Sequence, residues 1–149
     1  MKKSTSLKDF LNQKDFQKIK LHLISSNHYK IIAKINNTKG WFVLDTGASM
    51  TFVAQTAIEK FRLDIIEPQK IKVHGAGPGE IETKISKDNK LRIGERIFEK
   101  HNIACIDLNP INRAFKSADL AEVDGIIGAD ILKKGNAVID YDKNYLYLK

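Results

Sequence analysis

One short stretch of the chain joins a carboxylate to residue types that could make it reactive. Asp45 follows the apolar residues 41–44, and Thr46 and Gly47 come directly after it. Because apolar β-branched and aromatic residues lie on both sides, the pattern predicts two strands joined by a turn at Asp45, and Gly47 favours such a turn. A carboxylate among buried backbone is costly unless it is hydrogen-bonded or paired with another titrating group. Asp45 is therefore a candidate for acid–base chemistry.

This turn and a second stretch downstream together resemble the active-site motifs of the aspartic proteases. The first motif consists of the five residues of the turn, Asp45, Thr46, Gly47, Ala48 and Ser49. The second lies within residues 123–132, where two apolar residues and a glycine lead into a short helix. A separation of about eighty residues between the motifs is similar to that in the single-domain, retropepsin-like branch of the family. The resemblance covers residues 29–149.

The chemistry implied by this resemblance needs two carboxylates that share one proton. The ionised carboxylate takes a proton from a water molecule, while the neutral one hydrogen-bonds the carbonyl oxygen of the peptide. This chain has a single D-T-G motif, because its later aspartates lack that context. The resemblance therefore implies an aspartic endopeptidase that acts on peptide or protein substrates as a twofold homodimer. Each subunit would contribute Asp45, and neither a metal nor a cofactor would take part.

The same resemblance assigns supporting roles around Asp45. The Gly47 amide would bond the carboxylate, and the Thr46 hydroxyl would lock the two loops of the dimer together. Ala48 would line the floor of the cleft, and Ser49 would support the loop. An apolar shelf beneath the loop would come from three residues of the second motif, Ile126, Ile127 and Gly128.

A glycine-rich segment lies between the two motifs. It consists of Gly75, Ala76, Gly77, Pro78 and Gly79. Similar glycine spacing occurs in dinucleotide-binding loops, but those need a helix directly afterwards. Residues 80–86 instead alternate in polarity, which predicts a strand and hence a hairpin tip. By position in a retropepsin-like protein this would be the flap over bound peptide, and a plain hairpin is the alternative.

The remaining pattern predicts a mainly β framework with two or three short helices. The resemblance implies that this framework is the retropepsin-like acid-protease half-barrel. Strands are expected over residues 18–23, 29–35, 41–45, 70–74 and 80–86, with a closing hairpin over residues 137–148. Apolar residues at helical spacing predict helices within residues 4–16, 54–61 and 111–120. We expect residues 1–16 to be a lysine-rich N-terminal extension and residues 17–149 to be the protease domain.

Composition and charge restrict the other possibilities. No apolar run reaches the length of a membrane span, and the basic N-terminus lacks the apolar core of a signal peptide, so a cytoplasmic protein is expected. The net charge of +7 lies entirely within residues 1–40, which hold nine lysines and two aspartates. An anion- or nucleic-acid-binding protein is therefore an alternative, but a solvated lysine-rich surface is favoured and no RNA-binding motif supports a nucleic-acid partner.

Other candidate residues have structural interpretations. The four histidines lack the spacing of zinc ligands and are expected to be surface or structural residues. Cys105, the single cysteine, is expected to be an inert core thiol. Asp130 is expected to cap the helix after Gly128, and Asp124 to sit in the turn before it. For Asp45 the alternatives are a turn aspartate that bonds its own backbone, and a catalytically silent binding or assembly module of the same fold.

Overall fold

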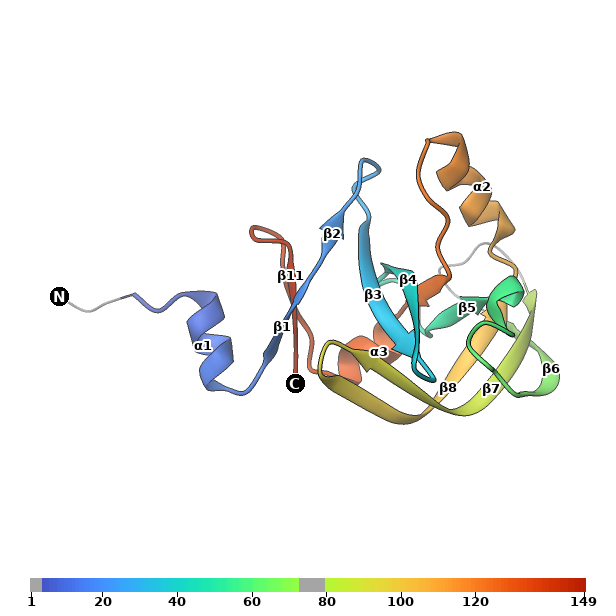
Figure 1. Ribbon diagram of the computed structural model, residues 1–149, viewed down its shortest axis with the longest axis horizontal. Helices are drawn as coiled ribbons and strands as arrows, with labels where there is room; N and C mark the ends of the chain where they lie inside the picture. The colour runs from blue at the N-terminus through green and yellow to red at the C-terminus, as the bar shows by residue number, and fades with distance from the viewer. Residues whose placement is uncertain (1–3, 73–79) are drawn as a thin grey trace.

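The computed structural model describes residues 4–72 and 80–149 (Figure 1). The elements follow in the order α1 (Leu7–Gln13), β1 (Gln17–Lys20), β2 (His22–Leu23), β3 (Tyr29–Ile35), β4 (Thr38–Leu44), β5 (Phe52–Ala54), η1 (Gln55–Ala57), β6 (Ile65–Lys72), β7 (Glu80–Ile93), β8 (Arg96–Ile106), α2 (Asn109–Ser117), β9 (Gly125–Ile127), α3 (Ala129–Lys134), β10 (Val138–Asp140) and β11 (Tyr145–Leu148). The fold is mainly β, as the sequence predicts.

Eight strands form one sheet that curls back on itself. The order across this sheet is β2-β3-β4-β9-β5-β8-β7-β6, and a further pairing joins β3 to β7. That pairing sets Ile35 opposite Leu91 and gives the sheet its barrel-like form. Buried and exposed residues alternate along the second half of β3, as expected of a strand with one face in the core. The enclosed core includes the fully buried Phe42, Phe52 and Phe61.

The short strand β9 organises the centre of this sheet. It runs parallel to β4, with Val43 opposite Ile126, and antiparallel to β5, with Phe52 opposite the same Ile126. A side chain at Gly125 would place its Cβ 2.1 Å from the Phe52 carbonyl oxygen, so only glycine allows the strands to approach this closely. The arrangement brings the end of β4, which carries Asp45, next to the start of α3.

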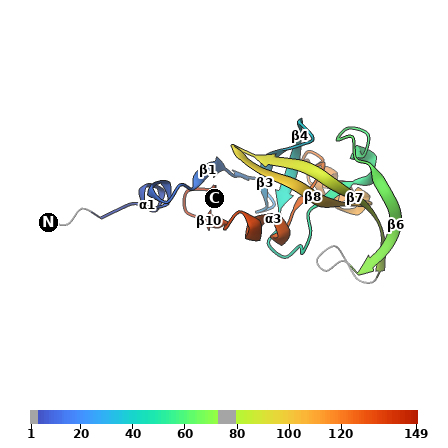
Figure 2. The same cartoon turned by 90° about the horizontal axis from the view of Figure 1, so that it is seen from below.

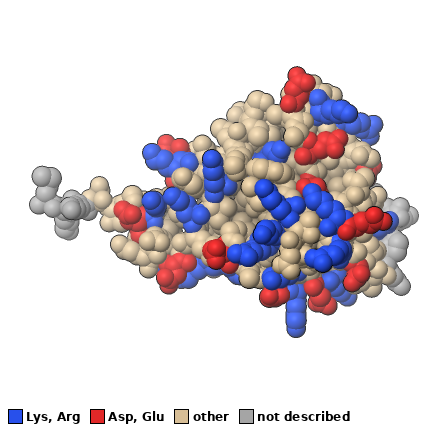
Figure 3. All heavy atoms as spheres, in the orientation of Figure 1, with Lys and Arg blue, Asp and Glu red and all other residues tan. Residues whose placement is uncertain are grey.

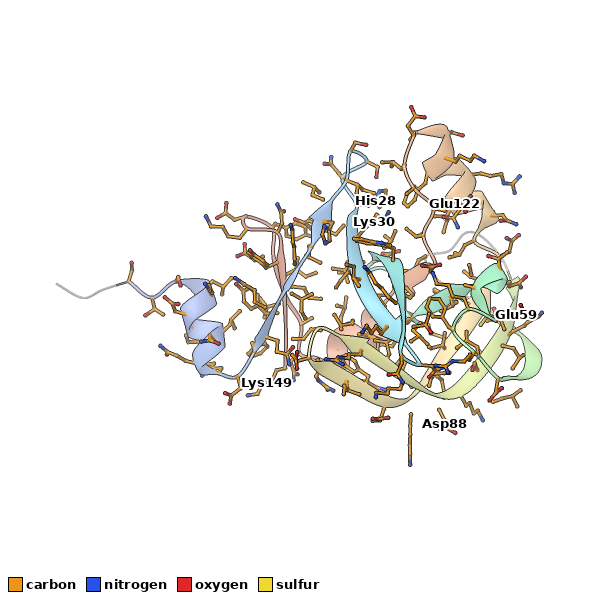
Figure 4. All side chains as sticks on the ribbon, in the orientation of Figure 1. His28, Lys30, Glu59, Asp88, Glu122 and Lys149 are labelled. Atoms are coloured by element: carbon orange, nitrogen blue, oxygen red, sulfur yellow. The ribbon has the colours of Figure 1, made fainter. Side chains whose placement is uncertain are left out.

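A second sheet of three strands, in the order β1-β11-β10, joins the first strand of the chain to its last two. Gln17 pairs with Leu148 at one end of the β1–β11 ladder, and Lys149 beyond it holds its ammonium 5.8 Å from the Phe16 ring centroid (Figure 4). Before β1, α1 is capped by Ser6, whose hydroxyl accepts a hydrogen bond from the Asp9 amide. Figures 1 and 2 both show α1 at the opposite end of the molecule from β6.

Several of the predicted elements have different bounds in the structure. The strand expected over residues 18–23 is divided between β1 and β2, which belong to different sheets, and the strand expected over residues 80–86 continues to Ile93 as β7. The helix expected over residues 54–61 is a single 3-10 turn, Gln55–Ala57, because Ala54 still belongs to β5 and Arg62 adopts a positive φ of 53°. The apolar spacing correctly marked buried positions, since Ala57 and Phe61 lie in the core, but turns rather than a helix present them. The strand expected at residues 70–74 begins earlier, at Ile65, and pairs with β7 across an irregularity.

The helix expected over residues 111–120 is confirmed as α2, which starts slightly earlier, at Asn109, with a proline in its first turn. On the face of the molecule drawn in Figure 3, Lys and Arg side chains are interspersed with Asp and Glu. In the part of the chain that the structure describes, no helix is both long and apolar enough to cross a membrane.

Candidate active site

The Asp45 turn is fixed by backbone hydrogen bonds on both sides of the carboxylate. The Asp45 amide donates to the Ile127 carbonyl at 3.0 Å, which extends the β4–β9 pairing by one residue. The Gly47 amide donates to Asp45 Oδ1 at 2.9 Å, and the Ala48 amide donates to the Asp45 carbonyl at 3.2 Å. The side chain is half-buried at the end of the strand. The carboxylate is therefore held in one orientation while it stays accessible to water.

The structure gives a reason for glycine at position 47 that differs from the turn conformation suggested by the sequence. Among the described glycines only Gly94 has a positive φ, so the backbone of Gly47 is not left-handed. A Cβ at position 47 would instead lie 3.3 Å from Asp45 Oδ1, the atom that its amide binds. Gly47 therefore provides a close approach of its backbone to the carboxylate rather than an unusual turn conformation.

The loop after Asp45 rests on the second motif. Ile126 and Ile127 are buried in β9, and Ala48 is buried above the start of α3. The Ala129 amide donates to the Ala48 carbonyl at 2.7 Å. A Cβ on Gly128 would lie 2.4 Å from the Met50 carbonyl oxygen and 2.7 Å from that of Ala48. The loop thus lies directly on the Gly128 backbone, and the two motifs pack as one unit.

The tip of the turn faces solvent beside an apolar depression. Thr46, Gly47 and Ser49 are exposed. Thr46 borders an open depression of about 330 Å³ between the turn, α3 and β10. Its other lining residues are Ala129, Leu132, Lys133, Asn136, Ala137 and Ile139. Apolar side chains beside a polar turn form a surface that another chain could cover.

Asp130 does not cap α3, contrary to the expectation from the sequence. Gly128 occupies the cap position, and Asp130 lies inside the first turn. Its Oδ1 accepts hydrogen bonds from the Thr51 hydroxyl and the Ile131 amide, both at 2.8 Å. Its Oδ2 accepts from the Thr51 amide at 3.0 Å and from His101 Nε2 at 2.9 Å. Burial favours a raised pKa for Asp130, but the bonds from His101, Thr51 and Ile131 outweigh it and hold the pKa below its usual value.

Asp124 lies beside Trp41 in the middle of β4, where its amide donates to the Trp41 carbonyl at 2.8 Å. Its Oδ2 accepts a hydrogen bond from the Trp41 amide at 3.0 Å, and its Oδ1 lies 3.0 Å from Lys60 Nζ. It therefore ties the start of β9 to its neighbours and is not within the Asp45 site. Since Asp130 is fully occupied by Thr51, Ile131 and His101, neither aspartate of the second motif supplies a second carboxylate beside Asp45.

The remaining site residues from the sequence fall into two groups. The proposed flap residues Gly75, Ala76, Gly77, Pro78 and Gly79 lie outside the described residues, and the antiparallel pair Lys72–Glu80 flanks them. Cys105 is buried in β8, where burial raises the pKa of its thiol to about 11, as expected for an inert core residue. Among the residues described, no cluster of three or more His, Cys, Asp or Glu side chains could hold a metal ion.

Sequence reasoning missed His101 and Thr51. His101 is buried in β8 and joins Asp130 to Lys134, and Thr51 is buried at the start of β5. Both partners of Asp130 lie far from it in the chain, 29 and 79 residues away. No local spacing could have revealed these contacts. The one available signal was a threonine close behind the turn that carries the carboxylate.

Comparisons with known proteins point to one family. A family model described as aspartyl protease matches residues 31–131, a range that contains the Asp45 turn and most of the second motif. No curated protein sequence matches this chain. A retropepsin-like aspartic protease from Rickettsia conorii has 20% sequence identity and a TM-score of 0.60, with 89% of this chain and 90% of that chain covered.

Two further solved structures are similar to this chain. The EIAV protease, in complex with an inhibitor, has 18% identity and a TM-score of 0.55, over 78% of this chain and 95% of its own. The retroviral protease-like domain of Ddi1 from Leishmania major has 18% identity and a TM-score of 0.55, over 80% and 86%. At such identities the likeness concerns the fold, which is retropepsin-like.

Proposed function

Since the chain belongs to the aspartyl protease family, we propose that it is an aspartic endopeptidase whose active form is a homodimer. The observation that carries this proposal is the Asp45 carboxylate, which the Gly47 amide holds at 2.9 Å on an exposed turn. Each subunit would contribute one Asp45, because Asp124 and Asp130 are engaged elsewhere. The site is thus incomplete in a single chain.

The reaction follows from two carboxylates held close together. Two carboxyl groups at short range cannot both be ionised, because their negative charges repel, so the pair keeps one proton. The ionised Asp45 takes a proton from water as the water attacks the peptide carbonyl. The neutral Asp45 hydrogen-bonds the carbonyl oxygen and supplies the proton that the leaving nitrogen needs. Among the described residues only the Gly47 amide bonds this carboxylate, through Oδ1, so Oδ2 is left for the water.

The surface around Thr46 supports the dimer. Thr46 stands beside the apolar depression that Leu132 and Ile139 help to form. In the described sheet β10 pairs with β11 alone, so its outer edge has unpaired backbone groups that a partner strand could use. A second copy bound at this surface would place its Asp45 turn against the Asp45 turn of the first copy, because a twofold axis sets each interface residue near its own copy.

We propose an extended peptide as the substrate. An extended chain can be gripped through backbone hydrogen bonds, while side pockets select its apolar side chains. Residues 75–79 would close over it as a flap, between the paired ends of β6 and β7.

The test is hydrolysis of a diverse peptide mixture between about pH 3 and 7, the range in which a carboxylate pair titrates. Wild type, Asp45→Asn and the matched control Asp142→Asn, an exposed aspartate in the β10–β11 turn, would be compared under conditions shown by sedimentation to give dimers. We expect Asp45→Asn to lose activity by about a hundredfold or more and Asp142→Asn to keep it. Equal cleavage by Asp45→Asn would contradict the proposal, and a silent wild-type dimer would favour a binding or assembly module.

A further inference from the structure

A buried polar chain lies beneath the Asp45 loop and ends at the surface. The His101 side chain is 4% exposed, and its Nε2 lies 2.9 Å from Asp130 Oδ2. On the other side of the ring, Nδ1 lies 3.0 Å from Nζ of Lys134, an exposed residue near the end of α3. The imidazole therefore connects a half-buried carboxylate to a surface ammonium.

The chemistry of these groups fixes where the protons lie. An ammonium can only donate, so Nδ1 of His101 must accept from Lys134. The imidazole hydrogen is then on Nε2 and is donated to Asp130. The Asp130 carboxylate accepts four hydrogen bonds, two from Thr51 and one each from Ile131 and His101, which requires its ionised form.

The ionised carboxylate supports the catalytic loop through Thr51. The Thr51 hydroxyl donates to Asp130 and accepts the Gly128 amide at 3.1 Å. Gly128 is the residue on which the Ala48 and Met50 carbonyls rest. If Asp130 took up a proton, one of its oxygens would become a donor facing other donors, and the tie between Thr51 and Gly128 would lose its anchor.

Low pH favours protonation of Asp130, which would break these hydrogen bonds. A carboxylate pair hydrolyses peptides at the pH where one of its members is protonated, and burial pushes any other carboxylate nearby toward its neutral form as well. Asp130 must remain charged under those same conditions. The hydrogen bonds around it already hold its pKa below 3.8 against the opposing effect of burial.

We propose that His101 is a positioning residue that keeps Asp130 ionised in acid and so preserves the support beneath the Asp45 loop. A second proton on the ring, at Nδ1, would remove the acceptor for Lys134, so the Lys134 ammonium would rotate out into water. The Nε2–H bond to Asp130 is kept and becomes a bond between opposite charges, which is stronger than the neutral one. The catalytic consequence rests on the proposed function.

The charges facing the ring fit this role. From α3 it meets Asp130 and Lys134. From β7 the residue paired with it is Asn89, which is uncharged and hydrogen-bonds Ser86. Thr51, across the carboxylate, is also uncharged. Lys134, whose charge opposes protonation of His101, is exposed and can rotate away. Asp130, whose charge favours protonation, is held in place by its hydrogen bonds.

The main test compares His101→Gln with the wild type across the pH profile of kcat/KM. The glutamine amide can still donate to Asp130 but cannot become charged. We expect activity near pH 6.5 to stay within about twofold, while the acid limb moves up by about one pH unit, a tenfold loss at a pH on that limb. Lys134→Gln, the matched control, keeps the ionisable ring and should leave the acid limb in place. An unmoved acid limb in His101→Gln would overturn the proposal.

A second measurement does not depend on proteolysis. Acid unfolding followed by circular dichroism should occur about one pH unit higher in His101→Gln than in the wild type. The shift should disappear in an Asp130→Asn background, where residue 130 no longer has a carboxylate that can titrate. If the shift is seen although no peptide is cleaved, the positioning role stands and the proposed protease function fails. If the shift is absent, the positioning role fails whatever the enzyme does.

A third measurement uses the wild type, in case His101→Gln does not fold. The side-chain carboxyl of Asp130 and the His101 ring would be followed by NMR during titration from pH 7 downward. We expect the ring to take up its proton first, with Asp130 ionised throughout that step. Protonation of Asp130 before or together with His101 would overturn the proposal.

Discussion

Thr51 and Asp130, which are 79 residues apart in the chain, are joined by two hydrogen bonds, one from the Thr51 amide and one from its hydroxyl. The pair ties the end of the Asp45 loop to α3, the helix that follows the second motif. Since the Thr51 hydroxyl also accepts the Gly128 amide, the two motifs are linked by side-chain bonds as well as by the β9 pairings.

Thr51→Val should destabilise the protein by about 1–3 kcal/mol, because a half-buried oxygen of the Asp130 carboxylate and the buried Gly128 amide would each lose a partner. The free energy of unfolding in urea at pH 7 measures this. Thr56→Val, at an exposed threonine in η1, is the control and should change stability by less than about 0.5 kcal/mol. Equal stability of Thr51→Val and wild type would show that these bonds contribute nothing net.

Gly128→Ala should displace the Asp45 loop, because the new Cβ would lie 2.4 Å from the Met50 carbonyl oxygen. We expect a loss of about 1–3 kcal/mol in unfolding free energy together with a fall in peptide hydrolysis. Gly47→Ala adds the same methyl where the nearest atom lies 3.3 Å away, so its cost in stability should be smaller. A Gly128→Ala protein as stable as Gly47→Ala would contradict the close packing described here.

The lowered pKa of Asp130 predicts how stability depends on pH. In the unfolded chain the carboxyl titrates near 3.8, and in the folded protein it titrates lower, so its contribution is fully present above about pH 5. The contribution is lost as the pH falls through 3.8 toward the folded pKa, because the unfolded chain then binds the proton more readily. Unfolding free energies of wild type and Asp130→Asn between about pH 2.5 and 6 measure this. The slope should be flatter in Asp130→Asn, and identical slopes would contradict the prediction.

The proposed interface around Thr46 can be tested with Ile139→Glu. A carboxylate in the apolar depression would be desolvated on dimer formation, so the dimer should dissociate at least about tenfold more readily. Activity per subunit should fall at low protein concentration and recover at high concentration. Ile97→Glu changes an exposed isoleucine of β8 and should leave association unchanged. Sedimentation velocity gives the dissociation constants, and an unaltered Ile139→Glu dimer would place the interface elsewhere.

Local patterns in the sequence predicted many of the strands and helices. Apolar, β-branched and aromatic residues predicted the strands β3 and β4, and helical spacing predicted α1 and α2. The same spacing at residues 54–61 was misleading, because a run of turns can present apolar residues to the core at similar intervals. Spacing reports burial more directly than it reports backbone conformation.

The candidate site was only partly accessible from sequence. The Asp45 turn and its contact with Ile127 could be predicted from the two motifs. The role of Asp130 could not, because an acidic residue in the first turn of a helix usually serves that helix, whereas three of its four bonds here come from Thr51 and His101. Contacts between distant strands depend on the closure of the barrel, which no local window contains.

The pairing of Gln17 with Leu148 sets the start of β1 beside the end of β11. A short linker could therefore join residue 149 to residue 17, and the chain could be opened anew between the two motifs, at the exposed turn of Gly94 and Glu95. Such a circular permutant would keep each described strand pairing while it reverses which motif is synthesised first. The order of the two motifs along the chain is thus separable from their packing against each other.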